Sequence, residues 1–148
     1  MISRKETKFK HKYVMLLDDD ELDNYINEKM IQATGFSERT YVTSSGKSAM
    51  EFLNNLKLSY EQFDLVFPEV IFIDINMPIM DGFQFLELFL TTHGKNLKST
   101  QLVILTSSVF PEDKNKAKEI SDNIIFLNKP LTEEMLNGLS FSLNTNYI

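Results

Sequence analysis

A chain of 148 residues, with a hydrophobic share of 43% and a formal net charge of −6, has the length and composition of a single soluble domain. No apolar stretch approaches the roughly 20 residues of a membrane span and no signal-peptide pattern opens the chain, so we expect a cytoplasmic protein with no membrane partner. Because cysteine is absent, disulfides, thiolate metal sites and cysteine nucleophiles are excluded, and the acidic balance argues against nucleic acid as a partner.

The first twelve residues form a basic arm, because five of the fifteen Lys and Arg residues lie there. A charged terminus of this length is usually solvated, and we assign it no function. Residues 13–144 show one continuous pattern of apolar runs and helical periodicity, which we interpret as one domain. Residues 145–148 are expected to form a short tail, with no output domain after it.

Five short apolar runs have the length and composition of β-strands. In chain order they occupy residues 13–17, 40–43, 70–73, 102–106 and 124–127. Helical patterns separate them, and this alternation predicts a parallel sheet covered by helices on both faces, a doubly wound α/β domain. We expect the flavodoxin-like (βα)5 arrangement with strand order 2-1-3-4-5, in which ligands bind where the first and third strands lie side by side.

The helical patterns have recognisable ends. The first ends near Gly35, and the second opens at residues 44–46. The third covers residues 83–90, Pro111 suits the first turn of the fourth, and Glu133 suits the first turn of the last. The apolar side chains that mark the first helix are Leu22, Tyr25, Ile26 and Met30.

Polar residues stand where the inner strands end. In chain order they are Asp18, Asp19, Asp20, Asp74, Thr106 and Lys129. Because the carboxyl ends of parallel strands share one edge of the sheet, we expect these side chains to converge. Two carboxylates about 4 Å apart repel by roughly 4 kcal/mol at an effective dielectric of about 20, so they raise one another's pKa or recruit a cation. Oxygen ligands favour Mg²⁺, with Mn²⁺ as the other hard cation, and His11 and His93, in polar surroundings, are too few for a histidine metal cluster.

Asp74 is the carboxylate whose position is most costly, because it follows the apolar run VIFI and precedes Ile75. A pocket that combines a metal ion, a lysine and a hydroxyl can hold a phosphoryl group beside a carboxylate, and carboxylates act as nucleophiles toward phosphorus. Taken singly, Asp20 suits a helix cap, Thr106 a strand end and Lys129 the surface. Their joint occurrence at different strand ends favours a site for phosphoryl transfer.

Four segments, VMLLDDD, IFIDINMPIMDG, VILTSS and FLNKPLT, occur in this order and resemble the receiver domain of two-component response regulators. The resemblance covers residues 13 to 143, and DINMPxMDG is its most specific segment. It implies a stand-alone signalling protein that takes a phosphoryl group from a histidine kinase or a phosphotransfer protein. Such a protein is not an enzyme beyond its own phosphorylation and slow autodephosphorylation.

The resemblance also implies roles for the acidic residues. Asp74 matches the phosphoacceptor. Asp18 and Asp19 match the acidic pair that binds Mg²⁺ together with Asp74, and Asn76 matches the position that offers its backbone carbonyl to the metal. The acidic triplet can be aligned in more than one register. We take Asp18 and Asp19 as the pair, because four apolar residues precede it, and leave Asp20 to begin the helix.

Thr106 and Lys129 match the two residues that contact the phosphate, and Phe126 matches the aromatic switch position, here Phe rather than Tyr. Once Thr106 is drawn to the phosphate, Phe126 is expected to turn into the vacated space. This remodels the face formed by the helix that starts at Pro111, the strand 124–127 and the last helix, where a downstream target protein is expected to bind. The resemblance further suggests a cis bond between Lys129 and Pro130.

Two segments depart from the family pattern. Residues 57–67 are longer than the usual link, and we expect them to extend the second helix before a loop that Pro68 closes. No glycine precedes the fifth strand, so residues 121–123 must make that turn, with Asn123 able to adopt a positive φ.

Two alternatives remain open. One is a phosphorylation-independent interaction module on the same fold, which a broken acidic site would indicate. The other is an aspartyl phosphatase of the haloacid dehalogenase type, with Asp18 and Asp20 as its D-x-D motif. Leu22 stands where that family expects Thr or Val, and only Glu133 and Glu134 follow Lys129 as candidate metal ligands.

Overall fold

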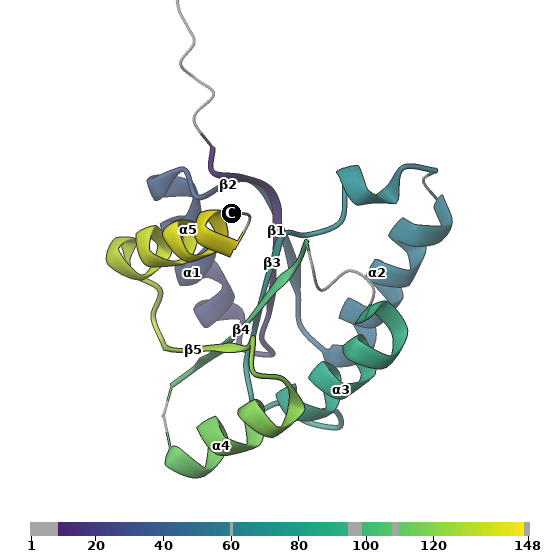
Figure 1. Ribbon diagram of the computed structural model, residues 1–148, viewed down its shortest axis with the longest axis vertical. Helices are drawn as coiled ribbons and strands as arrows, with labels where there is room; N and C mark the ends of the chain where they lie inside the picture. The colour runs from purple at the N-terminus through teal and green to yellow at the C-terminus, as the bar shows by residue number, and fades with distance from the viewer. Residues whose placement is uncertain (1–8, 60, 95–98, 108–109, 147–148) are drawn as a thin grey trace, which may run out of the picture.

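The computed structural model describes residues 9–59, 61–94, 99–107 and 110–146, without the side chains of residue 64 and of residues 140–146. Strands and helices alternate along the chain (Figure 1). In chain order they are β1 His11–Leu17, α1 Glu21–Thr34, β2 Ser37–Thr43, α2 Gly46–Ser59, the 3-10 turn η2 Phe63–Leu65, β3 Val70–Ile73, α3 Gly82–His93, β4 Gln101–Thr106, α4 Pro111–Ile120, β5 Ile125–Asn128 and α5 Glu133–Asn146.

The five strands form one parallel sheet in the order β2-β1-β3-β4-β5, which confirms the predicted doubly wound fold. Helices α1 and α5 cover one face, and α2, α3 and α4 cover the other (Figure 1). The order reverses between β1 and β3, so the crevice at their carboxyl ends is the place where this fold binds ligands. No helix in the described part of the chain is long and apolar enough to cross a membrane.

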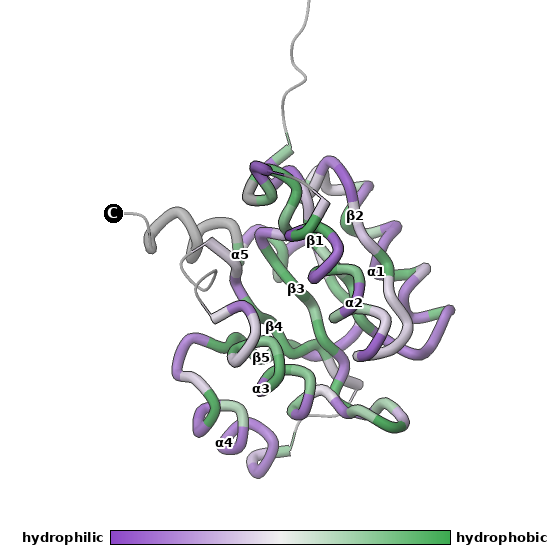
Figure 2. The backbone as a smooth tube through the Cα atoms, turned by 90° about the vertical axis from the view of Figure 1, so that its right-hand side faces the viewer, coloured by the Kyte–Doolittle hydropathy of each residue, from purple (hydrophilic) through white to green (hydrophobic). Residues whose placement is uncertain are grey.

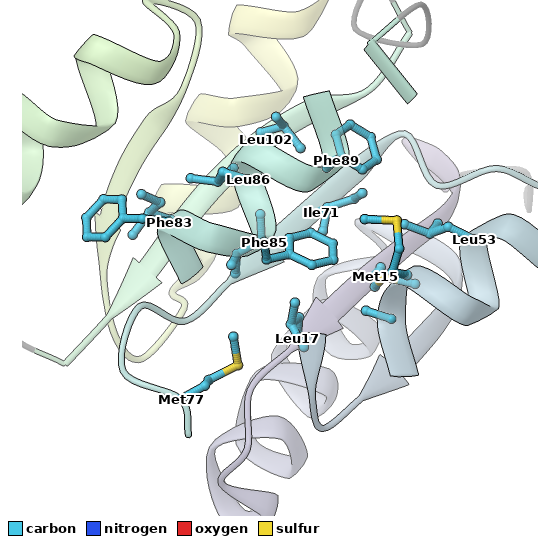
Figure 3. Packing of buried hydrophobic residues seen from close by; sticks show 14 of the residues in the cluster. Met15, Leu17, Leu53, Ile71, Met77, Phe83, Phe85, Leu86, Phe89 and Leu102 are labelled. Carbon is cyan, nitrogen blue, oxygen red and sulfur yellow. The ribbon is translucent and has the colours of Figure 1, made fainter. Parts of the chain in front are cut away.

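Two apolar cores lie on opposite sides of the sheet, because successive strand residues point to opposite faces. Met15, Ile71 and Leu102 face α2 and α3, where Phe85 and Phe89 pack against them (Figure 3). The opposite core contains Val14, Leu16, Val70, Phe72, Val103 and Leu105. All four residues of β3 are buried, and the central strands form a hydrophobic band in Figure 2, whereas α4 is largely hydrophilic. A fully covered central strand explains the unbroken run VIFI.

Helix α1 forms where it was predicted, but its apolar residues do not mark its buried face. Asp20 caps its first turn by accepting hydrogen bonds from the backbone N–H groups of Leu22 and Asp23, and Gly35 ends it with a positive φ of 68°. Leu22 is 64% exposed and Tyr25 is 58% exposed. The buried residues of this helix are Asn24, Asn27 and Ile31. The side of α1 that faces the sheet is therefore polar near its start.

Both unusual segments differ from their predictions. Helix α2 ends at Ser59 and does not extend through residues 57–67; the turn η2 follows, and buried Phe67 packs edge-on against Phe63. Before β5, Asn123 does not adopt a positive φ, because Ser121 is extended and its hydroxyl accepts a hydrogen bond from the Asn123 N–H. Side-chain hydrogen bonding thus replaces the special backbone conformation in that turn.

His93 is buried rather than in polar surroundings. Only 1% of it is exposed, and it packs between Phe67 and Phe89. Its Nε2 donates a hydrogen bond to Oδ1 of Asn54 at 2.8 Å, which joins α3 to α2. The prediction failed because neighbours in the sequence do not show which face of a helix the fold covers.

Candidate functional site

The register of the sheet brings the polar residues to one edge. Leu17 is paired with Ile73, so Asp18 and Asp74 follow neighbouring strands at the same level. The backbone N–H of Asp74 donates to the carbonyl of Leu17 at 2.9 Å, and that of Lys129 donates to the carbonyl of Thr106 at 2.7 Å. Backbone hydrogen bonds therefore position the candidate residues at the carboxyl ends of β1, β3, β4 and β5 around the switch point, the place between β1 and β3 where the strand order reverses.

Three carboxylates converge there. Asp18, Asp19 and Asp74 each offer an oxygen, and these oxygens lie within 4.8 Å of one another. Asp18 and Asp74 are 4% and 6% exposed, whereas Asp19 is exposed. Asp20 lies outside this group because its carboxylate caps α1. The acidic group suits a divalent metal ion, and oxygen ligands favour a hard one.

Lys129 supplies the positive charge at the centre of the site. Its Nζ lies 2.5 Å from Oδ2 of Asp18, 2.8 Å from Oδ2 of Asp23 and 3.2 Å from Oδ1 of Asp74, and its side chain is only 10% exposed. The bond from Lys129 to Pro130 is cis, as predicted. Asp74 therefore lies close to the ammonium group of Lys129 and to the carboxylates of Asp18 and Asp19.

The pKa values show that the negative charge is not fully compensated. Burial, reinforced by the charge of Asp18, raises the pKa of Asp74 to about 6 although Lys129 opposes the shift. Burial also raises the pKa of Asp18. Burial disfavours the charged form of Lys129, but its bonds to Asp18 and Asp23 outweigh burial and raise the pKa of that lysine. A bound divalent cation would relieve this excess of carboxylates.

Thr106 and Phe126 lie on the two strands beyond Asp74. Thr106 is fully buried, and its hydroxyl has no hydrogen-bond partner among the described residues. An unpaired buried hydroxyl is costly, so Thr106 is ready to donate to an incoming acceptor. Phe126 pairs with Ile104 in the sheet and is half-buried against the core that faces α2 and α3.

The loop after Asp74 returns tightly to the site. The backbone N–H groups of Met77 and Gly82 both donate to the carbonyl of Ile75, and Asn76 is exposed. A Cβ on Gly82 would lie 2.5 Å from the backbone carbonyl oxygen of Asp74, so only glycine fits there. The loop therefore keeps the start of α3 directly behind Asp74.

Sequence reasoning missed three residues of α1 that contact the site. Asp23 pairs with Lys129, Asn24 donates to the backbone carbonyl of Asp18 at 2.9 Å, and Oδ1 of Asn27 accepts from the backbone N–H of Leu131 at 3.0 Å. Their spacing was the available signal, because residues 20, 23, 24 and 27 share one side of a helix. Attention to apolar residues alone hid that polar stripe.

The fold and the site together define a flavodoxin-like domain whose switch point gathers carboxylates and one lysine. The chain belongs to the response regulator receiver domain family, which matches residues 14–139. This is a family of signalling domains of two-component and phosphorelay systems, and the acidic group of Asp18, Asp19 and Asp74 fits aspartate phosphorylation and magnesium binding. Membership in this family also removes the haloacid dehalogenase alternative, in keeping with the capping role of Asp20.

Known proteins resemble this chain along most of its length. A two component response regulator from Cytophaga hutchinsonii is 33% identical, with a TM-score of 0.78, and the match covers 90% of this chain and 97% of that one. Hybrid signal transduction histidine kinase M of Dictyostelium discoideum is 32% identical over 129 residues, which are 85% of this chain but 5% of that protein. The Mn²⁺-bound form of response regulator Rcp1, at 24% identity and a TM-score of 0.67, shares the fold over 90% of this chain and 96% of its own.

Proposed function

We propose that Asp74 accepts a phosphoryl group from a phosphohistidine on a histidine kinase or a phosphotransfer protein. The observation that carries this proposal is the position of Asp74, buried at the end of β3 with Lys129 at 3.2 Å and two further carboxylates within 4.8 Å. A carboxylate in this position can act as a nucleophile, and the neighbouring ammonium group of Lys129 can neutralise charge on a phosphoryl group. A structural salt bridge would not need the additional acidic residues.

In the proposed reaction, a carboxylate oxygen of Asp74 attacks phosphorus in line with the bond to the donor imidazole. The new O–P bond forms as the P–N bond breaks, and the electron pair of the P–N bond returns to the imidazole nitrogen. Lys129 donates hydrogen bonds to the phosphoryl oxygens, and the hydroxyl of Thr106 donates a further one. Asp74, Thr106 and Lys129 each lie at the carboxyl end of a strand, which supports this arrangement.

Asp18 and Asp19, with Asp74 and the backbone carbonyl of Asn76, are the residues that we propose hold Mg²⁺. The fit rests on their oxygen donors and on the uncompensated negative charge, and Rcp1 shows that a response regulator can hold the similar ion Mn²⁺. Bound there, the ion would neutralise charge on the transferred phosphoryl group.

We further propose that phosphorylation is transmitted through Thr106 and Phe126 to the face formed by α4, β5 and α5, where a downstream protein binds. The partly exposed ring of Phe126 next to β4 leaves it room to change position when Thr106 moves. A phosphorylation-independent interaction module remains the competing function, but it gives no reason for a complete acidic group beside Lys129.

Incubation with Mg²⁺ and acetyl phosphate, followed by intact mass spectrometry, tests the proposal. Wild type is expected to gain one phosphate, and Asp74→Asn is expected to gain none. The matched control is Asp20→Asn, which removes one carboxylate outside the acidic group while keeping a good helix cap, and it should be phosphorylated like wild type. An adduct that persists in Asp74→Asn would show that another residue accepts the phosphate.

A further inference from the structure

Lys129 divides its contacts between the phosphoacceptor site and helix α1. An ammonium group has three N–H donors, and Nζ of Lys129 lies near three carboxylates, those of Asp18, Asp23 and Asp74. The longest of the three distances, 3.2 Å, is the one to Asp74. In this state the lysine is therefore held closer to Asp18 and α1 than to the residue that receives the phosphate.

Asp23 reaches Lys129 because α1 is fixed to both neighbouring strand ends. Asn24 bonds the backbone of Asp18, and Asn27 bonds the backbone of Leu131 just after the Lys129–Pro130 bond. Asp23 precedes Asn24 and lies one turn before Asn27, so the same hydrogen bonds place its carboxylate over Lys129. The pair joins residues 106 positions apart.

Of its three contacts with carboxylates, the one with Asp23 is the contact that Lys129 can lose at the lowest cost. The side chain of Asp23 is 35% exposed, whereas those of Asp18 and Asp74 are 6% and 7% exposed. Water can replace the lysine at Asp23 but not at the buried positions. Asp23 also lies outside the group of oxygens that could hold a metal ion.

We propose that Asp23 is a positioning residue that competes with the phosphoryl group for Lys129. In the unphosphorylated protein it holds Nζ toward α1, and on phosphorylation of Asp74 that hydrogen bond passes to a phosphoryl oxygen. This inference rests on the proposed function of Asp74. It predicts that Asp23 restrains phosphorylation, so removing its charge favours the phosphorylated state.

Beryllofluoride, which mimics a phosphoryl group on aspartate, provides the test. Its affinity in the presence of Mg²⁺ is measured by NMR titration of wild type, Asp23→Asn and Glu21→Gln. The last variant removes one exposed charge from the same turn of α1 at a residue outside these ion pairs, and so measures the effect of charge alone. Asp23→Asn is expected to bind roughly twofold to fivefold more tightly than Glu21→Gln, the range expected for a partly exposed ion pair. Asp23→Glu, which restores the charge, should return toward wild type.

A second measurement reads the contact itself in the free protein. Solvent exchange of the Lys129 Nζ protons should be faster in Asp23→Asn than in Glu21→Gln, and the difference should vanish once beryllofluoride is bound. Equal affinities in these two variants, weaker binding by Asp23→Asn, or equal exchange in the free proteins would overturn the role of Asp23. If wild type binds no beryllofluoride and gains no phosphate, the proposed function of Asp74 fails instead.

Discussion

At the scale of single residues, the site depends on two uncharged residues as well as on its charged ones: Gly82, which has no side chain, and Thr106, whose hydroxyl is unpaired among the described residues. At Gly82 the backbone carbonyl of Asp74 occupies the space of a side chain, because a Cβ there would lie only 2.5 Å from its oxygen. Gly82 therefore allows the backbone at Asp74 to pack closely against the start of α3, whereas the unpaired hydroxyl of Thr106 can bond an incoming acceptor.

Replacing Gly82 by alanine should therefore damage the site. The added methyl group must push α3 away from the end of β3, at a cost of about 1–3 kcal/mol. Urea denaturation would show lower stability, and a Mg²⁺ titration would show weaker binding because Asp74 moves. Gly138→Ala is the control: a Cβ there meets no atom within 4 Å, and alanine within α5 should stabilise the protein by about 0.5–1 kcal/mol. Equal stabilities of the two variants would contradict the close approach.

At the scale of elements, helices are held by polar as well as apolar contacts. Helix α1 turns Asn24 and Asn27 toward the sheet and bonds the backbone beyond β1 and β5 with them. Helix α3 uses His93 in the same way, through its bond to Asn54 on α2. Because such bonds are buried, the protonation of the histidine is coupled to the packing of the two helices.

The stability of the α2–α3 contact should consequently depend on pH. Burial lowers the pKa of His93, and the charge of Lys57 lowers it further, so the unfolded chain binds this proton more readily than the folded protein. The contribution of His93 to the free energy of unfolding must then fall as the pH falls below about 6.5. His93→Gln can keep a bond to Asn54 but does not titrate, so it should lose less stability between pH 7 and pH 5. Parallel urea melts of the two proteins measure the difference, and identical pH profiles would contradict it.

At the scale of the whole molecule, the acidic site opposes folding when no cation occupies it. Asp18 and Asp74 are buried beside each other, and one lysine does not offset their repulsion, as the pKa of about 6 for Asp74 shows. The buried carboxylates thereby lower the stability of the protein, and the same carboxylates allow the site to bind a cation and a phosphoryl group.

Without Mg²⁺, the contribution of Asp74 to the stability of the whole protein should fall as its carboxyl group ionises. The folded protein holds the Asp74 proton more tightly than the unfolded chain, whose pKa is 3.8, so this contribution is complete below about pH 4 and is lost as the pH rises through about 6. Asp74→Asn should therefore be more stable than wild type at pH 7 in EDTA, by on the order of 1–3 kcal/mol. Mg²⁺ should stabilise wild type more than Asp74→Asn. Thermal and urea melts across this pH range, with Asp20→Asn as the control, measure both effects; a wild type that outlasts Asp74→Asn at pH 7 in EDTA would contradict the prediction.

The sequence by itself determined the fold and most of the residues that meet at the candidate site, because both depend on local patterns. The run VIFI is short, apolar and rich in β-branched residues, which favours a covered central strand, and Asp74 then stands at its carboxyl end. In a parallel sheet, Asp18, Thr106 and Lys129 reach the same edge for the same reason. The order of the strands agreed with the family resemblance.

Tertiary structure alone decided which face of each helix is covered. Nothing near Asp23 in the sequence indicates a contact with Lys129, which is 106 positions away. Leu22 has the apolar side chain of a core residue, but the structure buries Asn24 instead. His93 is buried because Phe67, which precedes β3, packs against it together with Phe89, one turn earlier in α3. Long-range packing selects among the faces that a helical pattern offers, and the sequence pattern specifies the helix but not that choice.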